Sequence, residues 1–453
     1  MALFRFFAFL FRALLTFFRE LPQNLLIGSR NLVAHKRRTV LLGLAIGGVT
    51  MLLLMLMGLS NGMRESMLKS ATTMMTGHVN VGGFFKVTAG VGNPVVTQYK
   101  KIREDVQSIV PELSYVTERG RGWAKLISDQ GSMQVGVGGI DIDRETGFRE
   151  VMIVTEGSLD ALKEPGKVLI FADQAKRLEA KVGDLLTLSA PTMRGSNNTI
   201  DLTVGAIAND VGIMSKFNIY VPNATLRQLY QLNEDTTGVL HLYLRDIALS
   251  NDVSERLRTK LPELGYVLMD KDPRPFWEKF EVVNREDWTG QKLDITTWEE
   301  EISFVQWTLR AMEVLTFVLT IALLVVIAIG LMNTMAIAIR ERTREIGTLR
   351  AVGMQRESVM ALFLTEAILL GVAAAVGGAV TGLVITGLLN VAEIQVPIAM
   401  QLFLMSERLH FAIPVSSLVF AVGFISLCVT FISLIPSYLA ARLRPVTAMH
   451  HIG

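Results

Sequence analysis

The stretch VLTFVLTIALLVVIAIGLMNTMAIAI, residues 314–339, decides the fold, because it carries no charged side chain from end to end. An α-helix rises about 1.5 Å per residue, so about 20 apolar residues cross a hydrocarbon core of about 30 Å. Three more windows meet this condition, at residues 39–60, 367–392 and 411–441. The sequence therefore predicts an α-helical membrane protein with four transmembrane helices.

The last window contains two prolines, Pro414 near its start and Pro436 near its end. Proline lacks the N–H that an inner helical turn needs, and it is tolerated best close to a helix end. We therefore expect a span shorter than the window, with ends that bend or break.

The composition agrees with a membrane protein and argues against several other classes. Half of the 453 residues are apolar, 19% are charged, and the mean hydropathy is +0.40. The net charge is only +2 and the basic residues form short clusters, so nothing favours nucleic-acid binding. The single cysteine, Cys428, excludes a disulfide within the chain.

Basic residues gather at one end of each predicted span. These basic flanks contain Arg30, Lys36, Arg37, Arg38, Arg340, Arg342, Arg344, Arg350, Arg356, Arg442 and Arg444. The opposite ends offer only Arg64, Lys69, Arg310 and Arg408. Because basic flanks remain in the cytoplasm, we expect both termini inside and residues 61–310 outside.

The N-terminal residues 1–22, MALFRFFAFLFRALLTFFRELP, resemble a signal peptide, but Arg12 interrupts the apolar run and no small-residue cleavage site follows. Arg5, Arg12 and Arg19 recur every seven residues, which places them on one stripe of an apolar helix. We expect a retained amphipathic helix at the lipid interface. A buried packing helix is the alternative.

The segment 61–310 has the charges, turns and short alternating runs of a soluble α/β domain. Residues 77–81 and 132–140 read as strands, whereas residues 98–110 and 251–261 have the apolar spacing of helices. Residues 167–189 read as strand, helix, Val-Gly-Asp turn and strand, and 204–221 supply further strands.

No catalytic or metal-binding constellation is recognisable. His78 and His241 lie far apart in sequence beside strand-like residues, so we interpret both as structural histidines. No G-x-x-x-x-G-K-[ST] loop occurs, so ATP chemistry is expected from a partner and no cofactor from this chain. Glu366 and Glu313 lie at span ends, where water or a nearby arginine would satisfy them better than a proton relay.

The third span carries small residues four positions apart. These residues are Gly371, Ala375 and Ala379 in one series and Gly378 and Gly382 in another. Small residues at this spacing let helix backbones approach closely. We favour packing within the four-helix unit over contact between two copies.

Residues 340–356 (RERTREIGTLRAVGMQR), followed by FLTEAILLG at 363–371, closely resemble the signature of the FtsX-like permease family. This family includes MacB-type exporters and LolC/LolE-type lipoprotein-releasing permeases. Residues 30–39 (RNLVAHKRRT), 175–186 and 440–449 (AARLRPVTAM) agree with it. Residues 59–81 look more like the lipoprotein-releasing branch than the MacB branch.

The resemblance implies a permease of a bacterial inner-membrane ABC transporter, with an external domain of the MacB periplasmic core type. It also implies a second permease copy or a paralogue, and a dimer of ATPase subunits that bind ATP and Mg²⁺. MacB carries its ATPase at its N-terminal side. Only about 38 residues precede the first span here, so we expect a separate ATPase polypeptide. A periplasmic adaptor or a lipoprotein carrier is a further candidate partner.

With the resemblance, the segments can be assigned in order. They are an amphipathic interfacial helix (1–22), a lead-in helix with the first span (23–60), the external core domain (61–310), the second span (311–339), a cytoplasmic coupling helix (340–357), the third span (358–392), a short external loop (393–410), the fourth span (411–441) and a cytoplasmic tail (442–453).

The coupling helix is expected to dock in a groove of the ATPase. Ile346 and Leu349, with Val352 or Gly353, fall at helical spacing and would form an apolar ridge, with Arg342, Arg344, Glu345 and Arg350 around it. Gly347 and Ala351 complete the expected site. An amphipathic helix lying on the membrane would look similar; the resemblance favours docking.

The expected function is export or extraction of a lipoprotein, lipid or other amphiphilic substrate from the outer face of the membrane. ATP-driven closure of the cytoplasmic subunits would move the external domains. The alternative is an FtsX-like signalling permease that regulates an external cell-wall hydrolase. A tethered enzyme would need a catalytic cluster, which the sequence does not offer.

Overall fold

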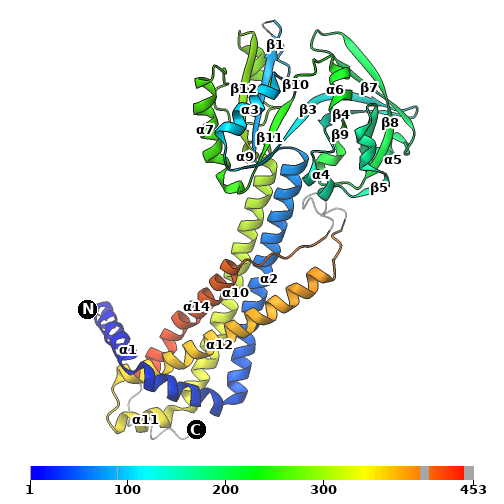
Figure 1. Ribbon diagram of the computed structural model, residues 1–453. Coiled ribbons are helices and arrows are strands. Elements are labelled where there is room, and N and C mark those ends of the chain that lie inside the picture. The colour runs from blue at the N-terminus through cyan, green and yellow to red at the C-terminus, as the bar shows by residue number, and fades with distance from the viewer. Residues whose placement is uncertain (1, 89, 398–407, 443–453) are drawn as a thin grey trace. The chain divides into compact units, whose positions relative to one another are not determined.

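A computed structural model describes residues 2–88, 90–397 and 408–442 (Figure 1). The chain divides into two compact units, which we describe separately. The helical unit comprises Met1–Met63, Ala311–Ile394 and Leu409–Gly453, and the sheet unit comprises Arg64–Arg310 and Gln395–Arg408. Four helices are long and apolar enough to cross a membrane, and the sheet unit mixes α and β elements. The predicted fold class is therefore confirmed.

Helices make up the helical unit. The long ones are α1 (Ala2–Ala34), α2 (Lys36–Met74), α10 (Ser303–Glu341), α12 (Arg356–Val391) and α14 (Val415–Ala441), and the short helix α11 (Thr343–Ala351) lies between α10 and α12 in the chain. The four candidate spans are parts of α2 and α10 and the whole of α12 and α14. Residues of α2 and α10 belong to both units.

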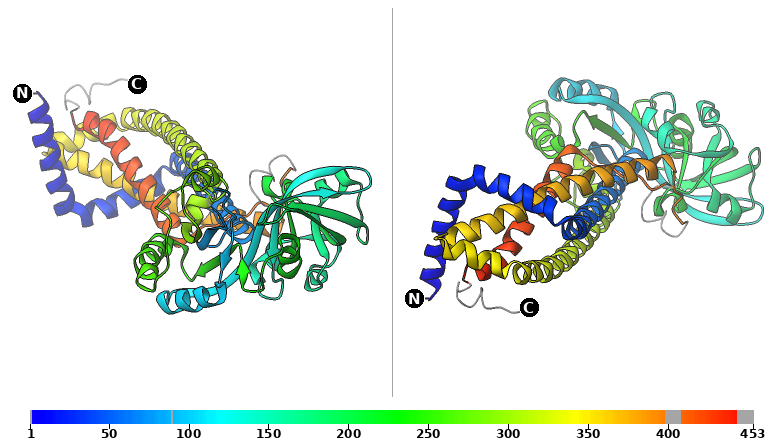
Figure 2. Two further views of the ribbon diagram at one scale, coloured as in Figure 1. Left: turned by 90° about the horizontal axis from the view of Figure 1, so that it is seen from above. Right: turned by 90° about the horizontal axis from the view of Figure 1, so that it is seen from below.

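Several helix ends differ from the expected segments. The helix expected over residues 1–22 continues to Ala34 with Pro22 inside it, and Figure 2 shows that α1 is bent. The first span continues to Met74, because after residue 60 no proline interrupts the helix. As expected, α14 starts late, directly after Pro414. The side chains of Arg5 and Arg12 and the tail from residue 443 lie outside the described residues.

The core of the helical unit is built from α2, α10, α12 and α14. Buried apolar side chains such as Ile46, Leu331, Ala375 and Ile425 meet there. The outer faces of the same helices carry exposed apolar side chains, which suit contact with lipid acyl chains.

The sheet unit holds a ten-stranded sheet in the order β12-β1-β11-β3-β4-β9-β6-β8-β5, with β7 paired to β3 and β8. The strands of this sheet are β1 (Val79–Lys86), β3 (Leu113–Ile127), β4 (Ser132–Ile140), β5 (Val154–Gly157), β6 (Lys167–Phe171), β7 (Leu185–Pro191), β8 (Asn197–Ala208), β9 (Asn218–Pro222), β11 (Val239–Leu244) and β12 (Gly290–Thr297). A separate pair joins β2 (Val96–Thr97) to β10 (Thr236–Thr237).

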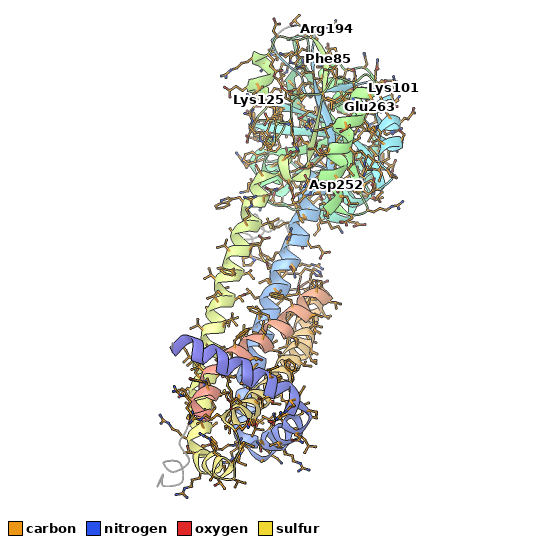
Figure 3. All side chains as sticks on the ribbon, turned by 90° about the vertical axis from the view of Figure 1, so that its left-hand side faces the viewer. Phe85, Lys101, Lys125, Arg194, Asp252 and Glu263 are labelled. Atoms are coloured by element: carbon orange, nitrogen blue, oxygen red, sulfur yellow. The ribbon has the colours of Figure 1, made fainter. Side chains whose placement is uncertain are left out.

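Two apolar cores lie along this sheet. In the first, α3 (Tyr99–Ile109) and α7 (Ser250–Glu263) cover β1, β11 and β12, and Figure 3 labels Lys101 and Glu263 on these helices. In the second, α5 (Ala172–Leu178) and α6 (Asn223–Tyr230) pack on β3, β4 and β6 to β9. The long strand β3 pairs with β11 at its start and with β4 and β7 further on, so it contributes to both halves.

The remaining helices of the sheet unit are short. They are α4 (Thr146–Val151), α8 (Phe280–Arg285) and α9 (Trp298–Glu301).

Polar side chains of the sheet unit cap the C-terminal end of α2. Arg119 Nη1 and the Tyr220 hydroxyl each donate to the Met74 carbonyl at 2.8 Å, and the Tyr243 hydroxyl donates to the Thr72 carbonyl at 3.2 Å. Arg119 also forms a buried ion pair with Glu145 at 2.6 Å. The last carbonyls of a helix have no partner within the helix, so these contacts fasten α2 to the sheet.

Both histidines of this unit bond to the backbone, as the structural interpretation predicts. The Leu244 N–H donates to His78 Nδ1 at 3.0 Å. His241 is buried, and its Nδ1 lies 2.8 Å from the Gly77 nitrogen and 2.7 Å from Asn80 Oδ1.

Acidification from about pH 7.5 to about pH 5.5 should destabilise the sheet unit. Burial, followed by the cations of Arg119 and Arg121, holds the pKa of His241 well below its ordinary value of 6.5. Below pH 6.5 the unfolded chain therefore binds a proton that the folded chain does not, and stability falls as the pH falls. One such group changes the unfolding free energy by at most about 1.4 kcal/mol per pH unit.

Thermal unfolding of the wild type and of His241→Gln at both pH values checks this expectation. The variant keeps a side chain that can accept the backbone N–H, and it should lose less stability on acidification. An equal loss in both proteins would contradict the role given to His241.

Candidate coupling site

The segment between α10 and α12 folds as the short helix α11, closed by glycine. The Met354 N–H donates to the Leu349 carbonyl at 3.0 Å, and the Gly353 N–H donates to the Arg350 carbonyl at 3.2 Å. This pair of bonds is a Schellman motif, which requires a left-handed residue after the helix. Gly353 fills that position with φ of +110°, where a residue with a Cβ would be strained.

One face of α11 is buried against the rest of the helical unit. Ile346 packs in an apolar cluster with Val359, Phe363 and Ala440, and the neighbouring Gly347 is also buried. Arg350 Nη1 donates to the Ala441 carbonyl at 3.3 Å. The helix is therefore fastened to α12 and to the end of α14.

The opposite face of α11 is exposed and combines apolar and charged groups. Leu349 is 41% exposed and Val352 is 84% exposed, and Arg344, Glu345 and Ala351 are exposed too. The expected ridge is thus corrected in one respect. Ile346 does not share it, because at this position the helix turns its side chain inward.

Arg342 also departs from the expectation, because it lies behind the helix and not around the ridge. Its Nη1 donates to Glu366 Oε2 at 2.9 Å, and both side chains are buried. The prediction of a nearby arginine for Glu366 is confirmed. Nε and Nη2 of Arg342 have no hydrogen-bond partner within the described part of the chain. Removing one member of a buried pair typically costs about 3–5 kcal/mol.

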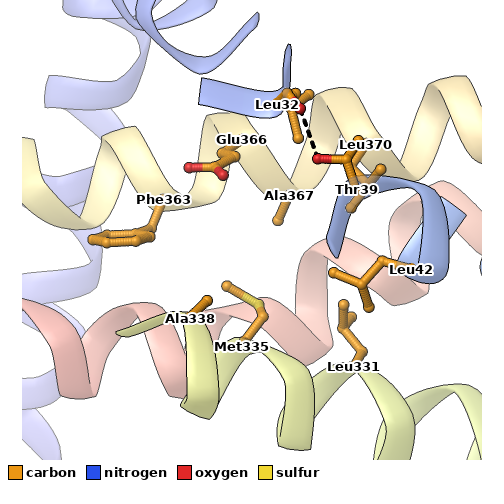
Figure 4. Close-up of a pocket in the computed structure, with 10 residues that line it drawn as sticks. All are labelled: Leu32, Thr39, Leu42, Leu331, Met335, Ala338, Phe363, Glu366, Ala367 and Leu370. Atoms are coloured by element: carbon orange, nitrogen blue, oxygen red, sulfur yellow. Dashed lines mark hydrogen bonds between the residues drawn. The ribbon is translucent and has the colours of Figure 1, made fainter. Parts of the chain in front are cut away.

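Figure 4 shows the surroundings of Glu366, which lines a small pocket with Phe363, Thr39 and Leu32. Thr39 Oγ1 donates to the Leu32 carbonyl at 2.8 Å across the junction of α1 and α2. Residues of α1, α2, α10 and α12 thus meet beside the Arg342–Glu366 pair.

The small residues of α12 lie against two neighbouring helices of the same chain. Gly371 faces Val429 of α14, and Ala375 is fully buried. Gly378 faces the backbone of Gly47 in α2, where an added Cβ would collide with the Gly47 carbonyl oxygen, and Gly382 faces Met51 of α2. At these small residues, α12 approaches α2 and α14 as closely as the backbones allow.

Across residues 2–88, 90–397 and 408–442, no group of three or more His, Cys, Asp and Glu side chains could hold a metal ion. In the same part of the chain, α11 has one face packed against the helical unit and the opposite face exposed.

Gly378→Ala should destabilise the helical unit by about 1–3 kcal/mol, because overpacking at a backbone contact forces the helices apart. Gly377→Ala is the matched control, since an added Cβ there meets nothing within 4 Å. The control should be neutral or slightly stabilising, since alanine favours helix by about 1 kcal/mol. The measurement is the unfolding midpoint of each variant in lipid nanodiscs. Equal midpoints would contradict the close contact between Gly378 and the Gly47 backbone.

Comparison with known proteins gives a consistent family relationship. Residues 317–445, which include α11, α12 and α14, match the family described as FtsX-like permease C-terminal. The chain is 24% identical over 439 residues, 92% of its length, to the macrolide export ATP-binding/permease protein MacB of Mannheimia succiniciproducens. It is 36% identical over 126 residues, 28% of its length, to the pyoverdine export ATP-binding/permease protein PvdT of Pseudomonas fluorescens.

The chain covers 59% of the Mannheimia protein and 17% of the Pseudomonas protein. Among solved structures, the periplasmic region of MacB from Actinobacillus actinomycetemcomitans matches with a TM-score of 0.29 and 10% identity, over 51% of this chain and 92% of that one. The extracellular domain of the transporter YknZ matches with a TM-score of 0.29 and 11% identity, over 47% and 98%.

The sequence matches agree with the four apolar helices and with the position of α11. This chain is therefore a membrane protein that carries an FtsX-like permease domain and is a homologue of the MacB proteins.

Proposed function

We propose that this chain is the permease part of an ABC exporter that acts on a lipoprotein, a lipid or another amphiphilic substrate at the outer face of a bacterial inner membrane. The FtsX-like match over residues 317–445 carries the proposal, because it joins the spans to α11. Relatives named for macrolide export and pyoverdine export support a transport role. A partner cassette binds ATP and Mg²⁺, since these 453 residues contain no G-x-x-x-x-G-K-[ST] loop.

In this proposal a separate ATP-binding-cassette subunit binds α11 and moves it when ATP is hydrolysed. Leu349 and Val352 offer apolar surface to a groove, with Arg344 and Glu345 at its edge. Ile346 and the Arg342–Glu366 pair hold the helix from behind, so that a push on the exposed face is passed to α10 and α12.

The force then travels along α2 and α10 to the sheet unit. Both helices have residues in the two units, and the end of α2 is capped by Arg119, Tyr220 and Tyr243. None of the four apolar windows, residues 39–60, 314–339, 367–392 and 411–441, contains a charged residue, which disfavours a polar channel. The substrate is accordingly handled outside the bilayer.

Leu349→Asp should reduce recovery of the ATPase with the full chain by at least about tenfold. The change removes an apolar contact worth roughly 1.5–3 kcal/mol and places a charge in the groove. Val391→Asp is the control, because Val391 is also exposed, at 81%, but lies at the far end of α12. The experiment isolates the tagged chain from its native membranes and quantifies the copurifying ATP-binding-cassette protein by mass spectrometry. Equal recovery with both variants would remove α11 as the docking element.

The orientation can be tested with single cysteines in a Cys428→Ser background. A membrane-impermeant maleimide added to intact spheroplasts should label Arg194→Cys, in the exposed turn between β7 and β8. Arg344→Cys on α11 should react only after lysis. Labelling of Arg344→Cys in intact spheroplasts would place α11 outside and exclude the proposed topology.

A further inference from the structure

Three strands of the sheet unit form a surface on which large and small residues alternate. In the antiparallel register, Trp123 of β3 lies opposite Gly136 of β4, and Arg121 lies opposite Gly138. In the parallel register with β9, Gly136 pairs with Asn218 and Gly138 with Tyr220. Paired residues share a face of a sheet, so two glycines separate Trp123 and Arg121 from the side chains of β9.

The glycines allow neighbouring side chains to lie flat on β4. An added Cβ at Gly136 would collide with Asn218 Oδ1, and one at Gly138 would come within 2.8 Å of the Tyr220 ring. Glycine within a strand weakens the sheet and often marks a place that a ligand approaches closely. Here it leaves a cavity of about 420 Å³ above the strands, within the size range of small-molecule sites.

The walls of the cavity are aromatic and in part exposed. Trp123 is 44% exposed and Phe217, next to Asn218, is 54% exposed. Phe276 and Trp277 line the cavity as well, and the Phe276 ring centre lies 5.5 Å from that of Trp123. Apolar walls with a few directed polar groups are typical of ligand sites.

The polar groups of this cavity have unused hydrogen-bonding capacity. The Arg121 guanidinium lies 3.9 Å from the Phe276 ring centre, and its Nε donates to the Gly238 carbonyl at 3.3 Å. Within the described residues, its two terminal nitrogens donate to no acceptor, and the Asn218 side-chain amide makes no hydrogen bond. Arginine stays protonated even when burial lowers its pKa, as it does here.

The carboxylates that act on Arg121 are already engaged elsewhere. Asp294 is paired with Lys279 at 2.8 Å. Glu301 accepts a hydrogen bond from the Thr296 hydroxyl at 2.8 Å. Burial raises the pKa of Glu301, which favours the neutral form of its carboxyl group. Arg121 therefore faces the cavity wall without a dedicated counterion.

We propose that this cavity binds a small amphiphilic anion, with its acidic group on the Arg121 guanidinium and a planar apolar body against Trp123 over the glycine floor. The ligand is an anion because the Arg121 guanidinium has no dedicated counterion. Its apolar body is planar because the cavity has aromatic walls over a glycine floor. The site would operate without ATP, so its test is separate from the test of the transport function.

The experiment uses the full chain in lipid nanodiscs and the photoreactive anion 4-benzoylbenzoate, with neutral 4-methylbenzophenone as the matched probe. After irradiation, mass spectrometry quantifies adducts on the peptides that contain Met74, Phe217 and Phe276, which line the cavity. Adducts on the spans report how much probe partitions into lipid. The anion should label the cavity peptides, relative to the spans, about tenfold more than the neutral probe does, as expected for a hydrogen bond to a charged group.

Two variants and a control make the test specific. Arg121→Gln should lower cavity labelling by the anion about tenfold, and Gly136→Val should lower it by filling the floor, at little structural cost because the obstructing Asn218 amide is flexible. Lys125→Gln, an exposed change further along β3, should have no effect. Equal labelling by both probes, or labelling unchanged in Arg121→Gln, would overturn the proposal even if Gly136→Val failed to fold.

Discussion

The capped end of α2 is the constraint on which the sheet unit is organised. A helix that ends inside a folded domain leaves carbonyl groups that water cannot reach, and each needs a donor. Here the donors are Arg119, Tyr220 and Tyr243, which come from three different strands. Burial raises the pKa of Tyr220 to about 12, so its hydroxyl keeps the proton that it donates. The junction therefore holds over the physiological pH range.

At the other end of the proposed force path, α11 meets a different requirement. A docking element needs an exposed contact surface and a rigid support, and on a short helix the two must occupy opposite faces. Leu349 and Val352 provide the first, and Ile346 with the Arg342–Glu366 pair provides the second. The Schellman turn at Gly353 then directs the chain into α12 without a loose loop.

Local patterns predicted much of this fold from the sequence. Alternation placed the strand Ser132–Ile140, and helical spacing placed α3 and α7, because these patterns reflect a single buried face. Nothing marked the extension of α2 to Met74, since its polar residues suit a loop equally well. Arg342 and Glu366 lie 24 positions apart, and only the packing of α11 against α12 brings them together. The cavity at Gly136 depends on the register of three strands, which no local pattern specifies.

Strand β3 has a consequence for how the sheet unit can deform. Its residues pair with β11 beside one core and with β4 and β7 beside the other. Both halves are therefore hydrogen-bonded to one continuous strand. A twist applied to one half is transmitted to the other through the backbone of β3. Two lobes joined by a flexible linker could melt or rotate independently. Here the shared strand β3 couples the two halves, so they should unfold and rotate together.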